Sequence, residues 1–230
     1  MAPPVLPPPN WLSFDCYGTL VDWEGGIRQA FRELANATAD NEKELFTIWE
    51  KLQWEKIRGP YTPYSKILQA SFCEAVEQLG IRSSSFAGEA FVNSLAGWEP
   101  FPDVNPALLC LAPRFKLAII SNTDRDLLGR TLRHFHVRFD ALITAEDAKS
   151  YKPNAEIFRY ALKRLACTPA EVVHVAFGAD YDLAPAGLLG IRVVYLNRKQ
   201  LPVPDLPLEA EIRTMTELVA LWRDVRAHPS

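Results

Sequence analysis

Short apolar runs alternate with amphipathic stretches along the C-terminal half of the chain. Residues 124–134, 154–166 and 182–189 have the periodicity of helices with one apolar face. The runs around them are rich in β-branched residues and predict strands at residues 116–121, 140–145, 172–178 and 192–197. Strands and helices in this alternating order are typical of an α/β fold, in which helices cover both faces of a parallel sheet.

A fifth predicted strand, WLSFD at residues 11–15, stands apart from the others. The residues that follow it have helical patterns instead of β-branched runs. In residues 64–80, an apolar stripe ends at a glycine, which favours a helix stop. We therefore predict a mostly helical cap at residues 23–99, inserted after the first strand. The core is then built from residues 11–22 and 100–230.

Composition and charge narrow the class of protein. With 230 residues, 48% apolar and 23% charged, the chain is typical of a globular protein, and its formal charge of -3 gives no electrostatic reason to expect nucleic-acid binding. The four cysteines contain no C-x-x-C pair, so neither a zinc site nor a disulfide framework is expected. No apolar run approaches the roughly 20 residues of a membrane span. The proline-rich residues 1–10 lack the features of a signal peptide, so we expect a disordered lead-in and a cytoplasmic protein without membrane contact.

Polar side chains gather at the predicted carboxyl ends of the strands and in the loops beyond them, where ligands bind to a parallel α/β sheet. Taken singly, each is most simply a helix cap, but several at one edge indicate a functional site. These residues are Asp15, Ser121, Asn122, Lys152 and Asp182.

Asp15 has the setting of a nucleophile. Gly18 permits a tight turn after it, and the backbone amides beyond can face an anion. Lys152 is expected to hold the aspartate ionised and to balance the charge that develops in the reaction. Ser121 and Asn122 can donate hydrogen bonds to the same anionic group. This set suits attack by the aspartate and hydrolysis of the resulting ester.

The chain carries four motifs that resemble those of the haloacid dehalogenase-like hydrolase superfamily. They are DCYGTL at 15–20, IISNTD at 119–124, SYKPNAEIF at 150–158 and HVAFGADYDLAPAG at 174–187. The resemblance implies a Rossmann-like core of parallel strands with a helical cap inserted after the first strand. It also implies that Asp15 is catalytic, and it assigns further roles to Thr19, Ser121, Asn122, Lys152 and Asp182.

The residue two positions after the nucleophile separates two branches of that superfamily. Phosphatases have an aspartate there, which protonates the leaving alcohol, whereas this chain has Tyr17, and a phenol is a poor acid near neutral pH. Aspartate followed by x-Tyr-Gly-Thr resembles the type II (S)-2-haloacid dehalogenases. That branch implies hydrolysis of a small 2-haloacid or related molecule through an aspartyl ester, with no metal or cofactor. On this resemblance Asp15, Lys152 and Asp182 are catalytic, and the substrate is bound by Tyr17, Thr19, Ser121 and Asn122.

Two departures from that branch concern the substrate. Where dehalogenases have serine and asparagine in the last motif, this chain has Phe177 and Ala179, although the neighbouring Asp180 could assist. Where they carry an arginine on the first long cap helix to bind the substrate carboxylate, this chain aligns Glu50, which would repel a 2-haloacid. The arginines that could take over this role are Arg28, Arg32 and Arg58.

Two alternatives stay open. One is a magnesium-dependent phosphatase with an unusual acid, in which Asp15 and Asp182 would hold Mg²⁺. The other is a catalytically weak family member that serves as a binding protein. Both enzyme interpretations imply a small-molecule substrate, and a homodimer is left open.

Three smaller features have simple structural interpretations. Cys16 is predicted to be a buried thiol turned away from the site. His174 is predicted to be structural and far from Asp182. We favour packing over pocket lining for the aromatic residues of the cap, which are Trp23, Trp49, Trp54, Tyr61 and Tyr64.

Overall fold

A parallel sheet of six strands forms the centre of the computed structural model, which describes residues 7–223 and 225. The strand order is β3-β2-β1-β4-β5-β6, and every neighbouring pair is parallel. The strands are β1 (Trp11–Phe14), β2 (Lys116–Ser121), β3 (Ala141–Thr144), β4 (Val172–Ala176), β5 (Arg192–Leu196) and β6 (Ala210–Ile212). The predicted α/β fold is confirmed. β2 has the predicted bounds, whereas β6 was not predicted.

The central strand β1 explains why an apolar run ends in a carboxylate. All four of its residues are buried, because β2 and β4 flank it and helices cover both faces of the sheet. Phe14 is in register with Ile119 of β2 and Val175 of β4. The chain therefore leaves β1, β2 and β4 at the same edge, and this edge brings their following residues together.

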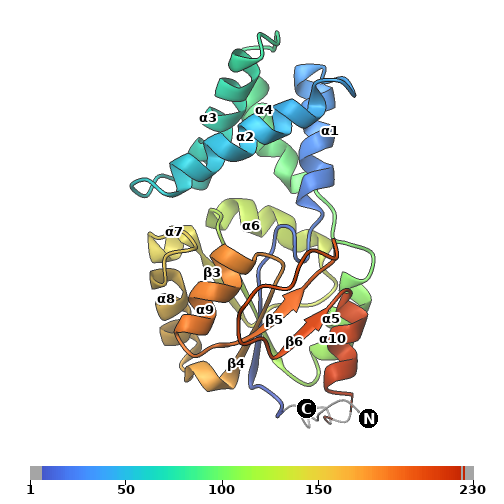
Figure 1. Cartoon of the computed structure of the whole chain (residues 1–230), viewed down its shortest axis with the longest axis vertical. Helices are drawn as coiled ribbons and strands as arrows, with labels where there is room; N and C mark the ends of the chain where they lie inside the picture. The colour runs from blue at the N-terminus through green and yellow to red at the C-terminus, as the bar shows by residue number, and fades with distance from the viewer. Residues whose placement is uncertain (1–6, 224, 226–230) are drawn as a thin grey trace.

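Helices on the two faces of the sheet complete the core (Figure 1). One face packs against α5 (Val104–Leu111), α6 (Arg125–Thr131) and α10 (Met215–Leu221). The other packs against α7 (Ala145–Ala148), α8 (Glu156–Leu165) and α9 (Ala184–Leu188). Short helical turns are η2 (Leu132–His134), η3 (Pro169–Glu171) and the π-helical η4 (Ala179–Leu183).

Four further helices stand beyond the carboxyl edge of the sheet (Figure 1). They are α1 (Trp23–Ala35), α2 (Glu42–Ile57), α3 (Tyr64–Gln78) and α4 (Ala87–Ser94), with the turn η1 (Leu95–Gly97). Stacked and edge-on aromatic rings form their core; the Phe72 and Phe91 centroids, for example, lie 4.7 Å apart. We propose that these helices form a separate cap domain at residues 23–99.

Hydrogen bonds near the start of α3 are among the contacts that hold the helical segment over the sheet. The carboxylate of Asp124 accepts hydrogen bonds from the backbone amides of Tyr64 and Ser65, at 2.7 and 2.8 Å, at the start of α3. The Tyr151 hydroxyl donates to the carbonyl oxygen of Thr62 at 2.6 Å. These bonds close one side of the space between the two parts.

The predicted disorder of residues 1–10 falls mainly on residues 1–6, which lie outside the described residues. Asn10 is part of the fold, because its backbone amide donates to the Glu171 carbonyl oxygen at 2.9 Å. Within the described part of the chain, no helix is long and apolar enough to cross a membrane.

Candidate active site

Asp15 lies directly after β1 and is held in one orientation. Its backbone amide donates to the Val175 carbonyl oxygen, which continues the pairing with β4 by one residue. The turn that follows uses Gly18 at a φ of +97°, a conformation that favours glycine. This turn brings the Thr19 hydroxyl within 2.8 Å of Asp15 Oδ2. Thr19 in turn accepts a hydrogen bond from the Phe177 amide at 3.2 Å, so Asp15 is tied to the loop after β4.

Lys152 connects two buried carboxylates. Its Nζ lies 2.8 Å from Asp15 Oδ1 and 2.5 Å from Asp182 Oδ1, and it also donates to the Ile120 carbonyl oxygen at 3.1 Å. An ammonium group has three donors, so these three acceptors use all of them. The whole side chain is buried, and the predicted proximity of Asp15, Lys152 and Asp182 is therefore present.

Asn122 has partners other than the expected substrate anion. Its Oδ1 accepts from the Lys152 backbone amide at 2.7 Å, and its Nδ2 donates to the Lys152 carbonyl oxygen at 3.0 Å. The side chain thereby fixes the loop that carries the lysine. Ser121 remains available to a ligand: it lines the pocket and is buried, and its hydroxyl has no hydrogen-bond partner among the described residues.

The prediction that His174 is far from Asp182 is wrong. His174 Nε2 lies 3.1 Å from Asp182 Oδ1, and both side chains are fully buried. The loop after β4 turns back on the strand through η4, so residues eight apart in sequence come into contact. Asp182 Oδ2 has no partner within the part of the chain that the structure describes. Asp182 thus has one oxygen fixed by two donors and one buried oxygen available for a further hydrogen bond.

The two carboxylates differ in their acidity. Burial raises the pKa of Asp15 above its ordinary value; the charge of Lys152 opposes this shift and the charge of Asp182 adds to it. Burial also acts to raise the pKa of Asp182, but Lys152 and His174 outweigh it, and the pKa lies below its ordinary value. Lys152 is desolvated as well, yet its two carboxylate partners raise its pKa. The lysine therefore stays charged, and of the two carboxylates beside it Asp182 is the more acidic.

Tyr17 and Cys16 flank this arrangement without being acidic. The Tyr17 hydroxyl lies 2.9 Å from Thr131 Oγ1, and burial raises its pKa well above the ordinary value. Burial, with a contribution from the charge of Asp15, likewise raises the pKa of the Cys16 thiol. Cys16 is fully buried, as predicted. Tyr17 is therefore a weaker acid here than a phenol in water.

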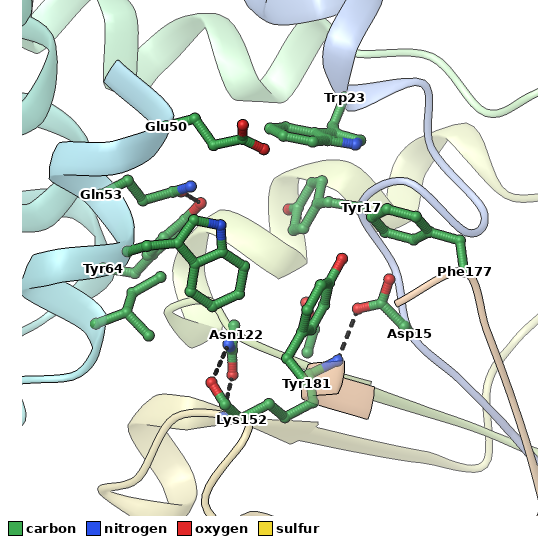
Figure 2. Close-up of a pocket in the computed structure, with 13 residues that line it drawn as sticks. Asp15, Tyr17, Trp23, Glu50, Gln53, Tyr64, Asn122, Lys152, Phe177 and Tyr181 are labelled. Carbon is green, nitrogen blue, oxygen red and sulfur yellow. Dashed lines mark hydrogen bonds and ion pairs between the residues drawn. The ribbon is translucent and has the colours of Figure 1, made fainter. Parts of the chain in front are cut away.

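A pocket of about 140 Å³ opens above Asp15 and Lys152, between the sheet edge and the helical segment (Figure 2). Its aromatic lining is Tyr17, Trp23, Trp54, Tyr64, Phe177 and Tyr181. Trp23, Trp54 and Tyr64 pack against the apolar core and also line the pocket, so the preference for packing over pocket lining is wrong for them. It holds for Trp49, which is fully buried in the helical core, and for Tyr61, which stacks on Tyr151 and does not line this pocket.

One face of α2 supplies the far wall of the pocket. Glu50, Gln53, Trp54 and Ile57 follow one another at helical spacing and all line the cavity. Sequence reasoning missed Gln53, Ile57 and, on the other wall, Tyr181. The helical spacing from Glu50 would have identified the first two, because residues three, four and seven positions apart share a face.

The three arginines considered as carboxylate binders do not line the pocket. Arg28 pairs with Glu24 and Glu42, and Arg32 pairs with Glu42, so the carboxylates beside them draw both guanidinium groups away. Arg58 is exposed at the end of α2. Asp180 is exposed as well and does not reach the site.

The donor set suits a magnesium ion poorly. Mg²⁺ requires about six oxygen ligands in octahedral geometry, whereas Asp15 and Asp182 direct their Oδ1 atoms at the same ammonium group. Among the described residues, no group of three or more histidine, cysteine, aspartate or glutamate side chains is arranged to hold a metal.

Known proteins resemble this chain over most of its length. The family model described as haloacid dehalogenase-like hydrolase matches residues 10–176. The chain is 27% identical over 218 residues to (S)-2-haloacid dehalogenase 1 of Pseudomonas sp. (strain CBS-3), covering 90% of this chain and 94% of that protein. It is 38% identical over 128 residues to haloacid dehalogenase-like hydrolase domain-containing protein 3 of Danio rerio, covering 54% and 52% of the two chains. The crystal structure of a dehalogenase superimposes with a TM-score of 0.83 at 25% identity, covering 96% of this chain and 98% of the other.

Proposed function

The chain belongs to the haloacid dehalogenase-like hydrolase family, and we propose that it hydrolyses a carbon–halogen bond in a small molecule through an ester of Asp15. The observation that carries this proposal is the contact of Asp15 with Lys152 at the base of the pocket, next to Tyr17. A nucleophile and its balancing cation are in place, while the position of a leaving-group acid holds a poorly acidic phenol. Similarity to named (S)-2-haloacid dehalogenases supports the same reaction type.

In the first step, a carboxylate oxygen of Asp15 attacks the carbon that bears the halogen. A carbon–oxygen bond forms, and the carbon–halogen bond breaks as halide leaves with the bonding electrons. Thr19 and Lys152 orient the carboxylate, and holding the nucleophile in the attacking geometry lowers the barrier. Halide leaves without a proton, so the reaction needs no general acid at the position that Tyr17 occupies.

In the second step, water attacks the carbonyl carbon of the Asp15 ester. A bond forms between that carbonyl carbon and the water oxygen, and the bond between the carbonyl carbon and the alkoxy oxygen of the ester breaks. This restores the carboxyl group of Asp15 and releases the product alcohol. One proton of the water ends on the alcohol oxygen, and the other is released from the regenerated carboxyl. Lys152, which contacts Asp15 Oδ1, stabilises the negative charge that develops on the carbonyl oxygen of the ester. The buried Oδ2 of Asp182, which has no hydrogen-bond partner among the described residues, is the acceptor that would position the water.

This mechanism uses no metal or cofactor, and the volume of the pocket suits a small organic substrate. The cytoplasmic location and the homodimer remain predictions.

The test is halide release by the wild-type protein and by Asp15→Asn. Asp180→Asn is the control, because Asp180 is exposed in η4 and does not line the pocket. We expect Asp15→Asn to lose on the order of 10⁴-fold or more in turnover, as nucleophile removal does in other hydrolases. A parallel panel of phosphate monoesters is measured with Mg²⁺ and with a chelator. Phosphate release that depends on Mg²⁺, without halide release, would establish the phosphatase alternative instead.

A single turnover in ¹⁸O-water tests the ester directly. Because the first product takes its new oxygen from Asp15, it should contain ¹⁶O, and solvent label should appear in the aspartate. Label in the first product would show direct attack by water.

A further inference from the structure

We propose that the pocket selects a small organic cation, such as an alkylammonium compound with a leaving group, through Glu50 and the surrounding aromatic rings. This inference rests on the proposed function, because it names the substrate class of the same site. It differs from the substrate of the named relatives, which carries a carboxylate.

The charges that line the pocket disfavour an anionic substrate. Among the described residues that line the pocket, the carboxyl groups are those of Asp15 and Glu50, and the ammonium group is that of Lys152. Lys152 already contacts Asp15 and Asp182 and uses its three donors on protein acceptors. A substrate carboxylate would therefore meet excess negative charge and find no free cation, whereas a substrate cation would reduce the repulsion.

Glu50 is the residue that gives the far wall its charge. Its side chain is half-buried, and it makes no ion pair or hydrogen bond with any residue that the structure describes. Burial raises its pKa, with Glu24 adding to the shift and Lys199 opposing it. A partly desolvated carboxylate without a partner is unfavourable, and a bound cation would reduce that cost.

Glu50 and Asp15 occupy opposite walls. In Figure 2, Glu50 extends from α2 beside Trp23, and Asp15 and Lys152 lie on the side of the sheet. A molecule with its electrophilic carbon at Asp15 therefore directs its other end toward Glu50.

The rings between these walls suit an organic cation. Aromatic faces attract ammonium groups, most strongly when water is excluded. Trp23, Trp54 and Tyr64 come from the helical segment, and Tyr17, Phe177 and Tyr181 come from the core. The protein cations that lie over aromatic rings in the described part of the chain use rings outside the pocket; they are Arg28, Lys116, Lys149 and Arg198.

Two neutral groups complete the site. Ser121 offers a buried hydroxyl that has no protein partner among the described residues. Gln53 is fixed by the Tyr64 hydroxyl, which donates to its Oε1 at 2.5 Å, while its amide nitrogen forms no hydrogen bond to a described residue. These groups can bind a polar atom of the substrate, but they supply no charge that would favour a carboxylate.

The test is binding of three unreactive ligands of one size, namely propylammonium, propionamide and propionate, measured by titration calorimetry on the full chain. We expect propylammonium to bind at least about tenfold more tightly than propionate, a difference typical of one charged contact. Glu50→Gln should remove most of this preference while propionamide binding stays within about twofold. Glu50→Arg should reverse the preference.

Glu55→Gln is the matched control, because Glu55 lies on the same helix with an exposed side chain and does not line the pocket. It should leave all three affinities unchanged. The inference is overturned if propionate binds wild type as tightly as propylammonium, or if Glu50→Gln leaves the cation preference intact. Thermal unfolding of each variant establishes that the protein is folded.

Halide release separates this inference from the proposed function. If (2-chloroethyl)trimethylammonium and 2-chloropropionate both release no halide while propylammonium binds through Glu50, only the reaction is wrong. If 2-chloropropionate is hydrolysed faster than (2-chloroethyl)trimethylammonium, and propionate binds more tightly than propylammonium, the reaction stands and the cation preference is wrong.

Discussion

The imidazole of His174 lies between Ser13 and Asp182, with Nδ1 2.9 Å from Ser13 Oγ and Nε2 3.1 Å from Asp182 Oδ1. All three side chains are fully buried. Asp182 in turn contacts Lys152, which contacts Asp15. A continuous chain of hydrogen bonds therefore runs from the interior of the sheet to the nucleophile. Within it, His174 contacts Asp182 from β4 and holds its carboxylate in position.

His174→Ala should lower kcat by about tenfold or more and leave KM nearly unchanged, because the residue positions Asp182 and is remote from the pocket. Loss of the buried partners should also lower the free energy of unfolding by about 1–3 kcal/mol. Steady-state kinetics and urea unfolding measure the two effects. His136→Ala, at an exposed position, is the control.

His174→Gln separates positioning from stability, since an amide can donate to Asp182 as the imidazole does. It should recover more of kcat than of stability. Equal kcat in the alanine and wild-type proteins would contradict the positioning role.

Lys152→Met should lower the free energy of unfolding by about 3–5 kcal/mol, because it leaves two buried carboxylates close together without a cation. Adding Asp182→Asn to this variant should restore part of the stability, since it removes one of the two charges. Urea unfolding of the single and double variants measures the coupling. Lys51→Met, whose side chain is 75% exposed, should change stability little.

The strands and the nucleophile could be predicted because their signals are local. β2 and β4 are apolar runs with β-branched residues, and such a run is the sequence pattern of a strand buried on both faces of a parallel sheet. β6 (Ala210–Ile212) could not be predicted, because the strand is short and includes an exposed glutamate. It forms a strand because it pairs with β5. Asp15 is marked by the glycine turn that follows it.

The contacts around the site depended on tertiary structure. His174 reaches Asp182 only because the loop folds back through η4, a turn without a periodic signal. Phe177 packs so closely on Gly18 that a Cβ there would lie 2.2 Å from the ring. This contact between segments distant in sequence is set by how β1 and β4 pair.

Tyr17→Phe tests whether the leaving group needs a proton. If halide leaves unaided, the variant should keep kcat within about threefold, because only the hydrogen bond to Thr131 is lost. That loss should cost about 1 kcal/mol of stability. A kcat reduced by a hundredfold or more, with a normally folded variant, would show that the hydroxyl takes part in the chemistry.

The acid limb of the pH profile should report Asp15. Only the ionised carboxylate can attack, and burial raises its pKa, so kcat/KM should rise with pH through a midpoint above the ordinary value of about 3.9. Asp182 does not account for a midpoint above the ordinary value, because its pKa lies below that value. Kinetics from about pH 4 to about pH 8 measure the midpoint.

The titration of Glu50 must be distinguished from that of Asp15, because burial also raises the pKa of Glu50 and both residues line the same pocket. The other charged groups that act on Glu50 are Glu24 and Lys199, which form an ion pair with each other. For a neutral substrate such as 2-chloropropionamide, Glu50→Gln should therefore keep the acid limb near its wild-type midpoint. A limb that disappears in Glu50→Gln would assign the titration to Glu50. Stability should change in the opposite direction to activity. Because the folded state raises the pKa of Asp15, the contribution of this residue to the free energy of unfolding falls as pH rises through that midpoint, and Asp15→Asn should remove this dependence.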